Sequence, residues 1–570
     1  MKSENISSTI NICLLLLLSL ALLIFLRYEF TRLGRSIYYD VLEYVSVYSI
    51  GMLVLFISIT CATLIYGKKT MKILGVILIP FIYIFEVWSN YPNIWARDVY
   101  LHGQIWELDI HGNLFSIHYL YPKEYPGFFL TFYEIYKVLG ISDIRIVNLF
   151  VLYPALMVVL ILFIYIISYK LLKDPKLSLI ASVIAFNLLQ FNRNELTFVH
   201  ANTRFYSIVI LLITFYALLS LKDHSRRVLV IFIMATACLA ISHVLFSLVP
   251  PVVLMTMLAL NAIQTRRSTR HLNHIIFYLF IALTLVTTWN FYNDYNYSVR
   301  FGITSLFNYI YHLLGWKLTT ASLTIREPIP FIGVVLRNYY KIEIATVTVV
   351  AYTYIVKRLL NGKLNYEEVV TASFSFSIAV VFISTLFSVS LGNSIDRMLI
   401  SFPIPTSIMF LNAISTMLLR KRKNAVKVLI PLILSAMTIA GYLLVHEESV
   451  LQAYTRPLDN ASIFINTYTM SQPVYSSVTS PFNIYYVYFN PASQLETVRV
   501  DSINSLNEVT EILLESKGVK VIDIRSILIW TRRCNDLQYS SSEWDNFVLS
   551  NINQYYDLIY SNGGYEYVYY

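Results

Sequence analysis

Long apolar runs alternate with short polar stretches along the first three quarters of this chain. Each run is close to the ~20 residues that a helix needs to cross a bilayer. The runs are continuous and lack the period-two alternation of barrel strands. The pattern predicts a polytopic α-helical membrane protein with about thirteen spans, at 9–26, 41–66, 73–89, 145–169, 177–192, 205–221, 227–242, 244–263, 273–290, 341–356, 368–389, 400–419 and 428–445.

Basic residues in the connecting loops predict how these spans are oriented. When the spans alternate in direction, six basic clusters fall on one side: 68–72, 170–176, 226–227, 266–270, 357–358 and 420–423. The positive-inside rule makes that side cytoplasmic. We therefore predict a multi-pass protein of the cytoplasmic membrane, with its N-terminus inside and its C-terminal region outside. No small-residue cleavage site follows the apolar run at 12–26, so we interpret it as a retained helix.

Composition agrees with a membrane protein and argues against a nucleic-acid-binding protein and a disulfide-rich scaffold. The 570 residues are 57% hydrophobic and only 14% charged, whereas soluble domains carry about 25% charged residues. Much of the net charge of +9 lies in the short loops, so it sets topology and does not indicate a nucleic-acid partner. Cys13, Cys61 and Cys238 lie in predicted spans and Cys534 in the tail, so no disulfide framework is expected.

The chain divides into three regions by polarity. Residues 1–72 hold two N-terminal spans, and 73–445 form a transmembrane domain with long outer loops at 90–144 and 291–340. Polar residues return in 446–570. There Ser505 and Glu508 mark a helix start, 519–524 is typical of a strand, and 557–569 is typical of a hairpin around Asn-Gly-Gly. We predict an extracytoplasmic α/β domain for this tail.

The largest polar cluster lies at 97–140, beside a membrane boundary. If 96–108 is helical, Asp98 and His102 share one face at i, i+4, beside an apolar stripe that includes Ile105 and Leu108. The segment 127–139 is too short to span, and polar residues recur in it every three positions. Both segments are therefore predicted to be helices at the membrane surface, with a polar side toward an aqueous cleft.

The cluster of carboxylates and imidazoles at 97–140 raises the question of which chemistry it could serve at a membrane boundary. A carboxylate at the membrane boundary can take the proton of an attacking hydroxyl. If the donor were a sugar on a lipid phosphate, the leaving group would be a stable phosphate anion, and its oxygens would need cations, preferably Arg. Arg204, Arg397 and Lys123 are the outer-face candidates. Asp98 and His102 could supply two ligands to a divalent metal, but no third is evident. We therefore assign no metal ligand, and a divalent metal stays open as a cofactor.

A set of motifs follows Asp98 in order. Tyr121-Pro-Lys-Glu-Tyr-Pro-Gly opens an aromatic helix that ends at Leu139-Gly140, and Arg145-Ile-Val-Asn-Leu-Phe enters the next span. Arg204-Phe-Tyr-Ser207, Ser242-His243, Asp396-Arg397-Met-Leu and, in the tail, Asp557-Leu-Ile-Tyr-Ser-Asn-Gly-Gly come later. Over about 73–419 this order resembles the GT-C superfamily of polytopic glycosyltransferases, which use polyprenyl-phosphate sugars. The branch it looks most like contains protein mannosyltransferases and aminoarabinose transferases.

The resemblance implies roles for these residues. Asp98 would be the base of an inverting transfer from a polyprenyl (dolichyl-type) phosphate sugar to a hydroxyl of a glycan, lipid or protein. Arg204, Arg397 and Lys123 would bind the donor phosphate. The substrate cleft would include His102, Tyr121, Glu124, Tyr206 and His243. The chain departs from the family in Lys123, which replaces the second Pro of a Pro-Pro pair, and in two additional early helices. It also lacks a Trp-Trp-Asp-Tyr-Gly motif in the tail, which argues against an oligosaccharyltransferase.

Other interpretations of the same residues stay open. Asp98 is also compatible with a solvated carboxylate beside Arg97, His243 with a polar turn residue, and the two arginines with snorkelling to headgroups. A transporter or flippase of lipid-linked solutes is the alternative function, although transporters usually place charges at mid-membrane. A scaffold for surface proteins is a third. The Ile- and Tyr-rich composition suggests an archaeal cell envelope.

Overall fold

The computed structural model describes most of a helical bundle and five strands of the tail. The described residues are 21, 24, 54–55, 57, 77–81, 83–84, 88, 104–105, 108–109, 111–116, 120–141, 143–190, 201–223, 225–263, 269–292, 331–386, 403–417 and the strands given below. Asp98, His102 and Arg397 lie outside these residues, as do Cys13, Cys61 and Cys534. Cys238 is a free thiol.

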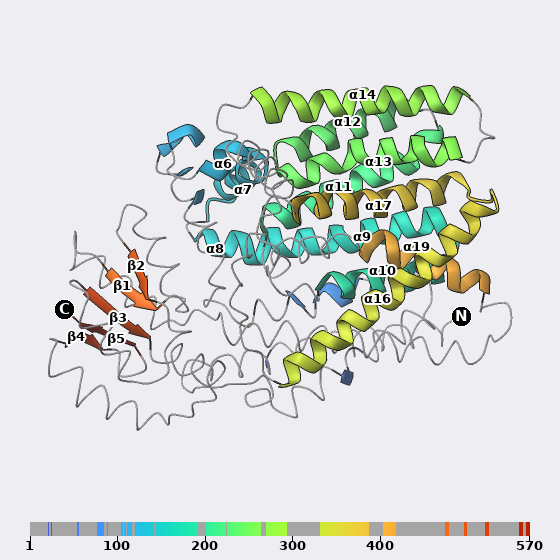
Figure 1. The fold of residues 1–570 in the computed structure, drawn as a ribbon. Helices are drawn as coiled ribbons and strands as arrows, with labels where there is room; N and C mark the ends of the chain where they lie inside the picture. The colour runs from blue at the N-terminus through green and yellow to red at the C-terminus, as the bar shows by residue number, and fades with distance from the viewer. Residues whose placement is uncertain are drawn as a thin grey trace, which may run out of the picture.

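Nine described helices form the bundle, which runs horizontally in Figure 1. They are α9 (Tyr153–Leu172), α10 (Pro175–Gln190), α11 (Thr203–Leu219), α12 (Arg226–Ala240), α13 (Val244–Ile263), α14 (Thr269–Tyr292), α16 (Phe331–Leu360), α17 (Tyr366–Leu386) and α19 (Pro403–Met417). The buried residues of the bundle make one continuous apolar core. Stacked rings join its parts, such as Phe215 of α11 and Phe374 of α17, whose centroids are 4.1 Å apart.

Within the described residues, three stretches are long and apolar enough to cross a membrane. They are Ile144–Leu172, Leu245–Ile263 and Leu272–Asn290. Three shorter apolar helices accompany them: Pro175–Leu189, Thr203–Leu219 and Pro403–Ile414. The helical architecture expected from the sequence is therefore confirmed for this part of the chain, and these helices have the length and composition of membrane spans.

Each predicted span from 145–169 to 400–419 coincides with one of these helices. The prediction of 244–263 matches α13 at both ends. The largest difference is α16, which begins at Phe331, although 291–340 was predicted to be an outer loop. Polar residues in its first half, including Arg337 and Lys341, lower the hydropathy without breaking the helix. Within the span predicted at 73–89, residues 77–81, 83, 84 and 88 are described, and all of them are helical. The spans predicted at 9–26, 41–66 and 428–445 fall wholly or largely outside the described residues.

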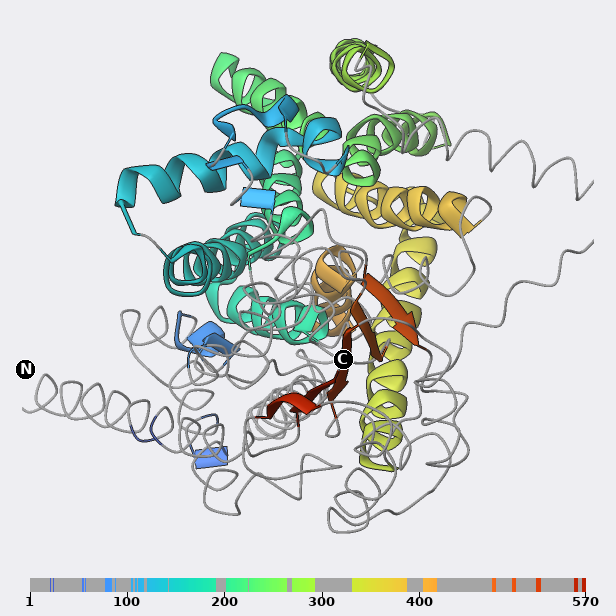
Figure 2. The same ribbon diagram turned by 90° about the vertical axis from the view of Figure 1, so that its left-hand side faces the viewer.

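Two short helices lie across one end of the bundle. They are α6 (Leu120–Glu124) and α7 (Pro126–Leu139), seen nearly end-on in Figure 1 and lengthwise in Figure 2. Pro126 stands in the first turn of α7, where its missing N–H costs nothing. Gly140 ends the helix with φ of 62°, a left-handed conformation that suits glycine. The helix predicted over 127–139 is thus present and lies transverse to the bundle.

After α7 the chain turns into the first long span through a π-helix. Asp143 caps α8 (Ile144–Ile146): its carboxylate accepts a hydrogen bond from the backbone N–H of Arg145 at 2.9 Å and is ion-paired with the Arg145 side chain at 3.0 Å. The π-helix η2 (Val147–Leu152) continues directly into α9. π-Helical turns are rare in proteins, and many of those that are known lie at functional sites.

The described part of the tail is a mixed sheet in the order β2-β1-β3-β5-β4. Its strands are β1 (Val474–Ser477), β2 (Leu495–Val498), β3 (Val519–Asp523), β4 (Leu558–Ser561) and β5 (Glu566–Tyr569). The predicted strand at 519–524 coincides with β3, and the predicted terminal hairpin is the antiparallel β4–β5 pair. β1 pairs with β2 and β3 in parallel, which requires crossover connections. The helix predicted after Ser505 lies outside the described residues.

Candidate active site

The N-terminal end of α7 is inserted against the turn between α12 and α13. The backbone N–H of Gly127 donates to the carbonyl of Ile241 at 2.9 Å. A Cβ at position 127 would overlap Oγ of Ser242 and come within 3.2 Å of the Ile241 carbonyl oxygen. The predicted Ser242-His243 motif and the glycine of the Tyr-Pro-Gly motif are therefore packed against each other, and any larger residue at 127 would force the Ser242 side chain to shift.

A second attachment joins the α6–α7 junction to the C-terminal end of α14. The indole Nε1 of Trp289 donates to the backbone carbonyl of Glu124 at 3.0 Å. The hydroxyl of Tyr125, a fully buried side chain, donates to Oδ1 of Asn290 at 3.4 Å. Nδ2 of Asn290 in turn donates to the carbonyl of Val286 at 2.9 Å. These bonds fix the backbone on which the candidate residues Lys123 and Glu124 lie.

The third partner of α7 is the first turn of α11. Oγ1 of Thr131 donates to the Gly127 carbonyl at 2.8 Å and lies 3.4 Å from the hydroxyl of Tyr206. The rings of Phe128 and Tyr206 are 5.7 Å apart. Tyr206, predicted for the substrate cleft, therefore contacts the same helix that carries Gly127. The Arg204-Phe-Tyr-Ser207 motif meets the Tyr-Pro-Gly motif here.

A buried asparagine fixes the start of α11. Nδ2 of Asn148 donates to the carbonyl of Ala201 at 3.1 Å, and its Oδ1 accepts from the N–H of Ala201 at 2.9 Å. The side chain of Asn202 then caps the helix by accepting from the N–H of Phe205 at 2.9 Å. Asn148 is fully buried in the π-helix η2. Arg204, a half-buried candidate phosphate ligand, thus lies beside backbone that is held by Asn148 and by the Asn202 cap.

The candidate residues differ in their surroundings. Glu124 is only 2% exposed and Lys123 is half-buried, while Tyr121 is described in its backbone alone. Nδ1 of His243 accepts from the backbone N–H of Leu245 at 3.3 Å, so the imidazole caps the first turn of α13. Its ring also packs edge-on against Phe246, at 4.8 Å between centroids.

The helix before α6 packs on the C-terminal half of α7. Gln104, Ile105, Leu108, Asp109 and His111 are helical, which agrees with the helix predicted to 108 and extends it to 111. Ile105 and Leu108 of the predicted apolar stripe are buried. The Lys137 ammonium forms an ion pair with Asp109, and this hydrogen bond raises the pKa of Lys137. The helices predicted at 96–108 and 127–139 therefore contact each other.

The structure brings four candidate residues, Lys123, Glu124, Tyr206 and His243, to the region around the N-terminal end of α7. Trp289, Asn290 and Thr131 hold the same region and were not predicted from the sequence. A Trp-Asn pair at the end of an apolar run is the signal that could have indicated them. Among the described residues no cluster of three His, Cys, Asp or Glu could hold a metal ion.

No family model matches the sequence, and no curated protein matches it. Solved structures match its fold. The archaeal oligosaccharyltransferase AglB from Archaeoglobus fulgidus, in complex with an inhibitory peptide and a dolichol-phosphate, aligns with a TM-score of 0.52 and 12% identity. That alignment covers 81% of this chain and 71% of AglB.

ArnT from Cupriavidus metallidurans, bound to undecaprenyl phosphate, aligns with a TM-score of 0.50 and 9% identity, over 88% of this chain and 98% of ArnT. Both proteins belong to the GT-C superfamily. At these identities the likeness concerns the fold. It confirms that this chain has the GT-C fold that the sequence resemblance implied.

Proposed function

We propose that this protein is a glycosyltransferase that moves a sugar from a polyprenyl phosphate to a hydroxyl group at the outer membrane face. The observation that carries the proposal is the shared fold of AglB and ArnT, each solved with a polyprenyl phosphate and each aligned over most of this chain. The cluster of candidate residues around the N-terminal end of α7 supports it. The missing Trp-Trp-Asp-Tyr-Gly motif favours a small sugar donor over an oligosaccharide.

In the proposed reaction the acceptor oxygen attacks the anomeric carbon of the donor. The Asp98 carboxylate takes the hydroxyl proton as the new C–O bond forms. The bond from the anomeric carbon to the phosphate oxygen breaks, and polyprenyl phosphate leaves as an anion with inversion at the sugar. The phosphate is stable as an anion, so no strong acid is required and no metal is assigned.

Cations must hold the phosphate oxygens through this step. We propose Arg204, Arg397 and Lys123 for that role, because guanidinium forks match phosphate oxygens in geometry and charge. Arg204 lies in the first turn of α11, where backbone N–H groups add partial positive charge. Tyr121, Glu124, Tyr206, His243 and His102 are proposed to line the cleft.

The proposed orientation puts α7 and the tail outside the cell. Figure 1 places α6, α7 and the sheet toward the same end of the bundle. The turn between α16 and α17, with Lys357 and Arg358, lies toward the other end. We propose that the tail forms an extracytoplasmic α/β domain and that the N-terminus is cytoplasmic. The acceptor is then a glycan, lipid or protein of the cell surface.

The test is sugar transfer by the purified chain. Protein in detergent is given polyprenyl-phosphate sugars, and release of polyprenyl phosphate is measured with acceptor present. We expect Asp98→Asn to lower kcat by about 10²-fold or more, because a positioned base contributes that much. Glu134→Gln is the matched control: it removes an exposed carboxylate from the solvent side of α7 and should leave the rate unchanged.

Full activity of a folded Asp98→Asn protein would refute the assignment of the base. The transporter alternative would be favoured by two results together. The protein would bind the lipid-phosphate sugar without releasing polyprenyl phosphate, and it would move the intact donor across vesicle membranes. In the described part of the chain, the ion pairs that involve α16 and α17 lie where α16 ends and α17 begins, which does not favour a charged path at mid-membrane.

A further inference from the structure

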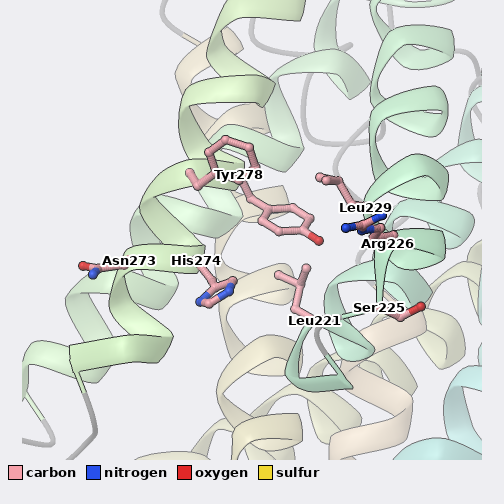
Figure 3. A pocket seen from close by; sticks show the side chains of 8 residues that line it. Leu221, Ser225, Arg226, Leu229, Asn273, His274 and Tyr278 are labelled. Atoms are coloured by element: carbon pink, nitrogen blue, oxygen red, sulfur yellow. The ribbon is translucent and has the colours of Figure 1, made fainter.

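A cavity of about 340 Å³ lies between the N-terminal end of α12 and α14, far from the candidate active site. Its lining residues are Leu221, Ser225, Arg226, Leu229, Asn273, His274, Phe277 and Tyr278. In Figure 3, Tyr278 and His274 point from α14 into this space, while Asn273 points away from it. The ring of Tyr278 is held in place by an edge-on contact with Phe232, at 4.9 Å between centroids.

The polar side of this cavity suits an anion. Arg226 is the first residue of α12, where the helix dipole adds partial positive charge. Among the side chains that the structure describes, Arg226 takes part in none of the ion pairs. The imidazole of His274 and the hydroxyl of Tyr278 supply further hydrogen-bonding groups. Together they present hydrogen-bond donors to one small, negatively charged group.

The other side of the cavity is apolar. Leu221, Leu229, Phe277 and the Tyr278 ring form its apolar walls. Phe277 is 52% exposed, and it belongs to a row of exposed apolar residues on the outermost helix in Figure 1. The others in this row are Leu272, Ile276, Phe280 and Leu283. Leu272–Asn290 is long and apolar enough to cross a membrane. If it does, this row faces lipid chains and the cavity opens toward the membrane.

We propose that this cavity binds the phosphate head of an anionic lipid, with the start of its hydrocarbon chain against Leu229 and Phe277. The site is separate from the proposed donor site. α12 has 15 residues, so its two ends are about 22 Å apart. The cavity lies at its first residue, and the turn that contacts α7 lies beyond its last. Under the predicted topology this places the lipid in the cytoplasmic leaflet, where basic pockets between helices bind anionic headgroups.

Native mass spectrometry of the full chain in detergent tests the proposal. Dioleoyl phosphatidic acid, dioleoyl phosphatidylcholine and inorganic phosphate are titrated separately. We expect one phosphatidic acid to be retained in preference to phosphatidylcholine, and Arg226→Gln to weaken this binding about tenfold, the effect of one lost hydrogen bond to a charged group. Arg227→Gln, which changes the adjacent exposed arginine outside the cavity lining, should change it less than about twofold.

A second variant, Leu229→Trp, fills the apolar half of the cavity and should also abolish retention while Arg226 is intact. Equal losses in Arg226→Gln and Arg227→Gln would overturn the proposal, because they would indicate attraction to a basic surface in general. Inorganic phosphate that competes as well as the lipid would also overturn it, since the apolar walls would then contribute nothing. Sugar transfer is not measured, so the result is independent of the proposed enzyme activity.

Discussion

Gly127 is the residue at which the Tyr-Pro-Gly motif of α7 contacts the Ser242-His243 motif. Its backbone N–H is bonded to Ile241, and its missing side chain leaves room for Ser242. The contact requires the absence of a Cβ rather than a special backbone angle. Glycine inside a helix is less stable than alanine. Its presence at 127 therefore indicates that the close contact with Ser242 matters more than helix propensity.

We expect Gly127→Ala to lower the free energy of unfolding by about 1–3 kcal/mol, the usual cost of overpacking a tight contact. The measurement is thermal unfolding of the detergent-solubilised protein. In the double variant Gly127→Ala with Ser242→Ala, the Oγ that the new methyl would overlap is gone, so part of the loss should be recovered. Strictly additive effects of the two changes would contradict the proposed contact.

Asn148 is a second buried residue that joins two segments, because its side-chain amide bonds to the backbone at the start of α11. Its amide forms both hydrogen bonds with the backbone of Ala201. We expect Asn148→Ala to cost about 2 kcal/mol or more, because it leaves a buried donor and acceptor unpaired. Asn361→Ala, at an exposed turn where the amide bonds only to Lys357, is the control and should cost little.

If Arg204 binds the donor phosphate, Asn148→Ala should also raise KM for the donor more than it lowers kcat, since the start of α11 is displaced. An unchanged KM in a folded Asn148→Ala protein would separate Asn148 from the donor site.

At the scale of elements, an ion pair holds the start of α17. Glu367 precedes the predicted span 368–389 and pairs with Lys222 in the short helix η4 (Leu221–Asp223). Burial raises the pKa of the Glu367 carboxyl, but the hydrogen bond and charge of Lys222 outweigh it, and the pKa lies below 4.5. The adjacent Glu368 is fixed by Arg358 at 3.0 Å and by Asn412 at 3.1 Å.

A depressed carboxyl pKa gives stability that is present above the unfolded pKa and lost as pH falls through the folded value. Wild-type protein should therefore unfold at a higher temperature than Glu367→Gln at neutral pH, and the two should converge well below pH 4.5. The stability difference should be about 1 kcal/mol or less, because Lys222 is partly exposed. Glu134→Gln should show no such convergence. A pH-independent gap would contradict the ion-pair explanation.

Elements were more predictable than contacts. Length and hydropathy predicted α13 at both ends because its apolar run is bounded by a turn and by arginines. The same criteria missed the first third of α16, because a stretch that contains Arg337 is not a continuous apolar run. The site was predictable only as a set of motifs. The pairing of Glu124 with Trp289 joins residues 165 apart, and no local pattern encodes such a distance.

At the scale of the whole molecule, the predicted topology is open to direct measurement. In a Cys534→Ser background, a cysteine is placed either at Glu134, exposed on α7, or at Asn361, exposed between α16 and α17. Intact cells are treated with a membrane-impermeant maleimide. We expect Glu134→Cys to be labelled and Asn361→Cys to be labelled only after the membrane is opened. The reverse pattern would invert the proposed orientation and move the candidate site to the cytoplasm.

The attachment of the α6–α7 junction to α14 also determines when the site can be assembled during synthesis. Glu124 and Tyr125 each bond to a residue 165 positions downstream. At the usual pace of translation the ribosome needs on the order of ten to thirty seconds to cover that length. During this interval α6 and α7 have left the ribosome while Trp289 and Asn290 do not yet exist. The contact of α6 and α7 with α14 can therefore form only after α14 has been synthesised, so it is a late event in biogenesis.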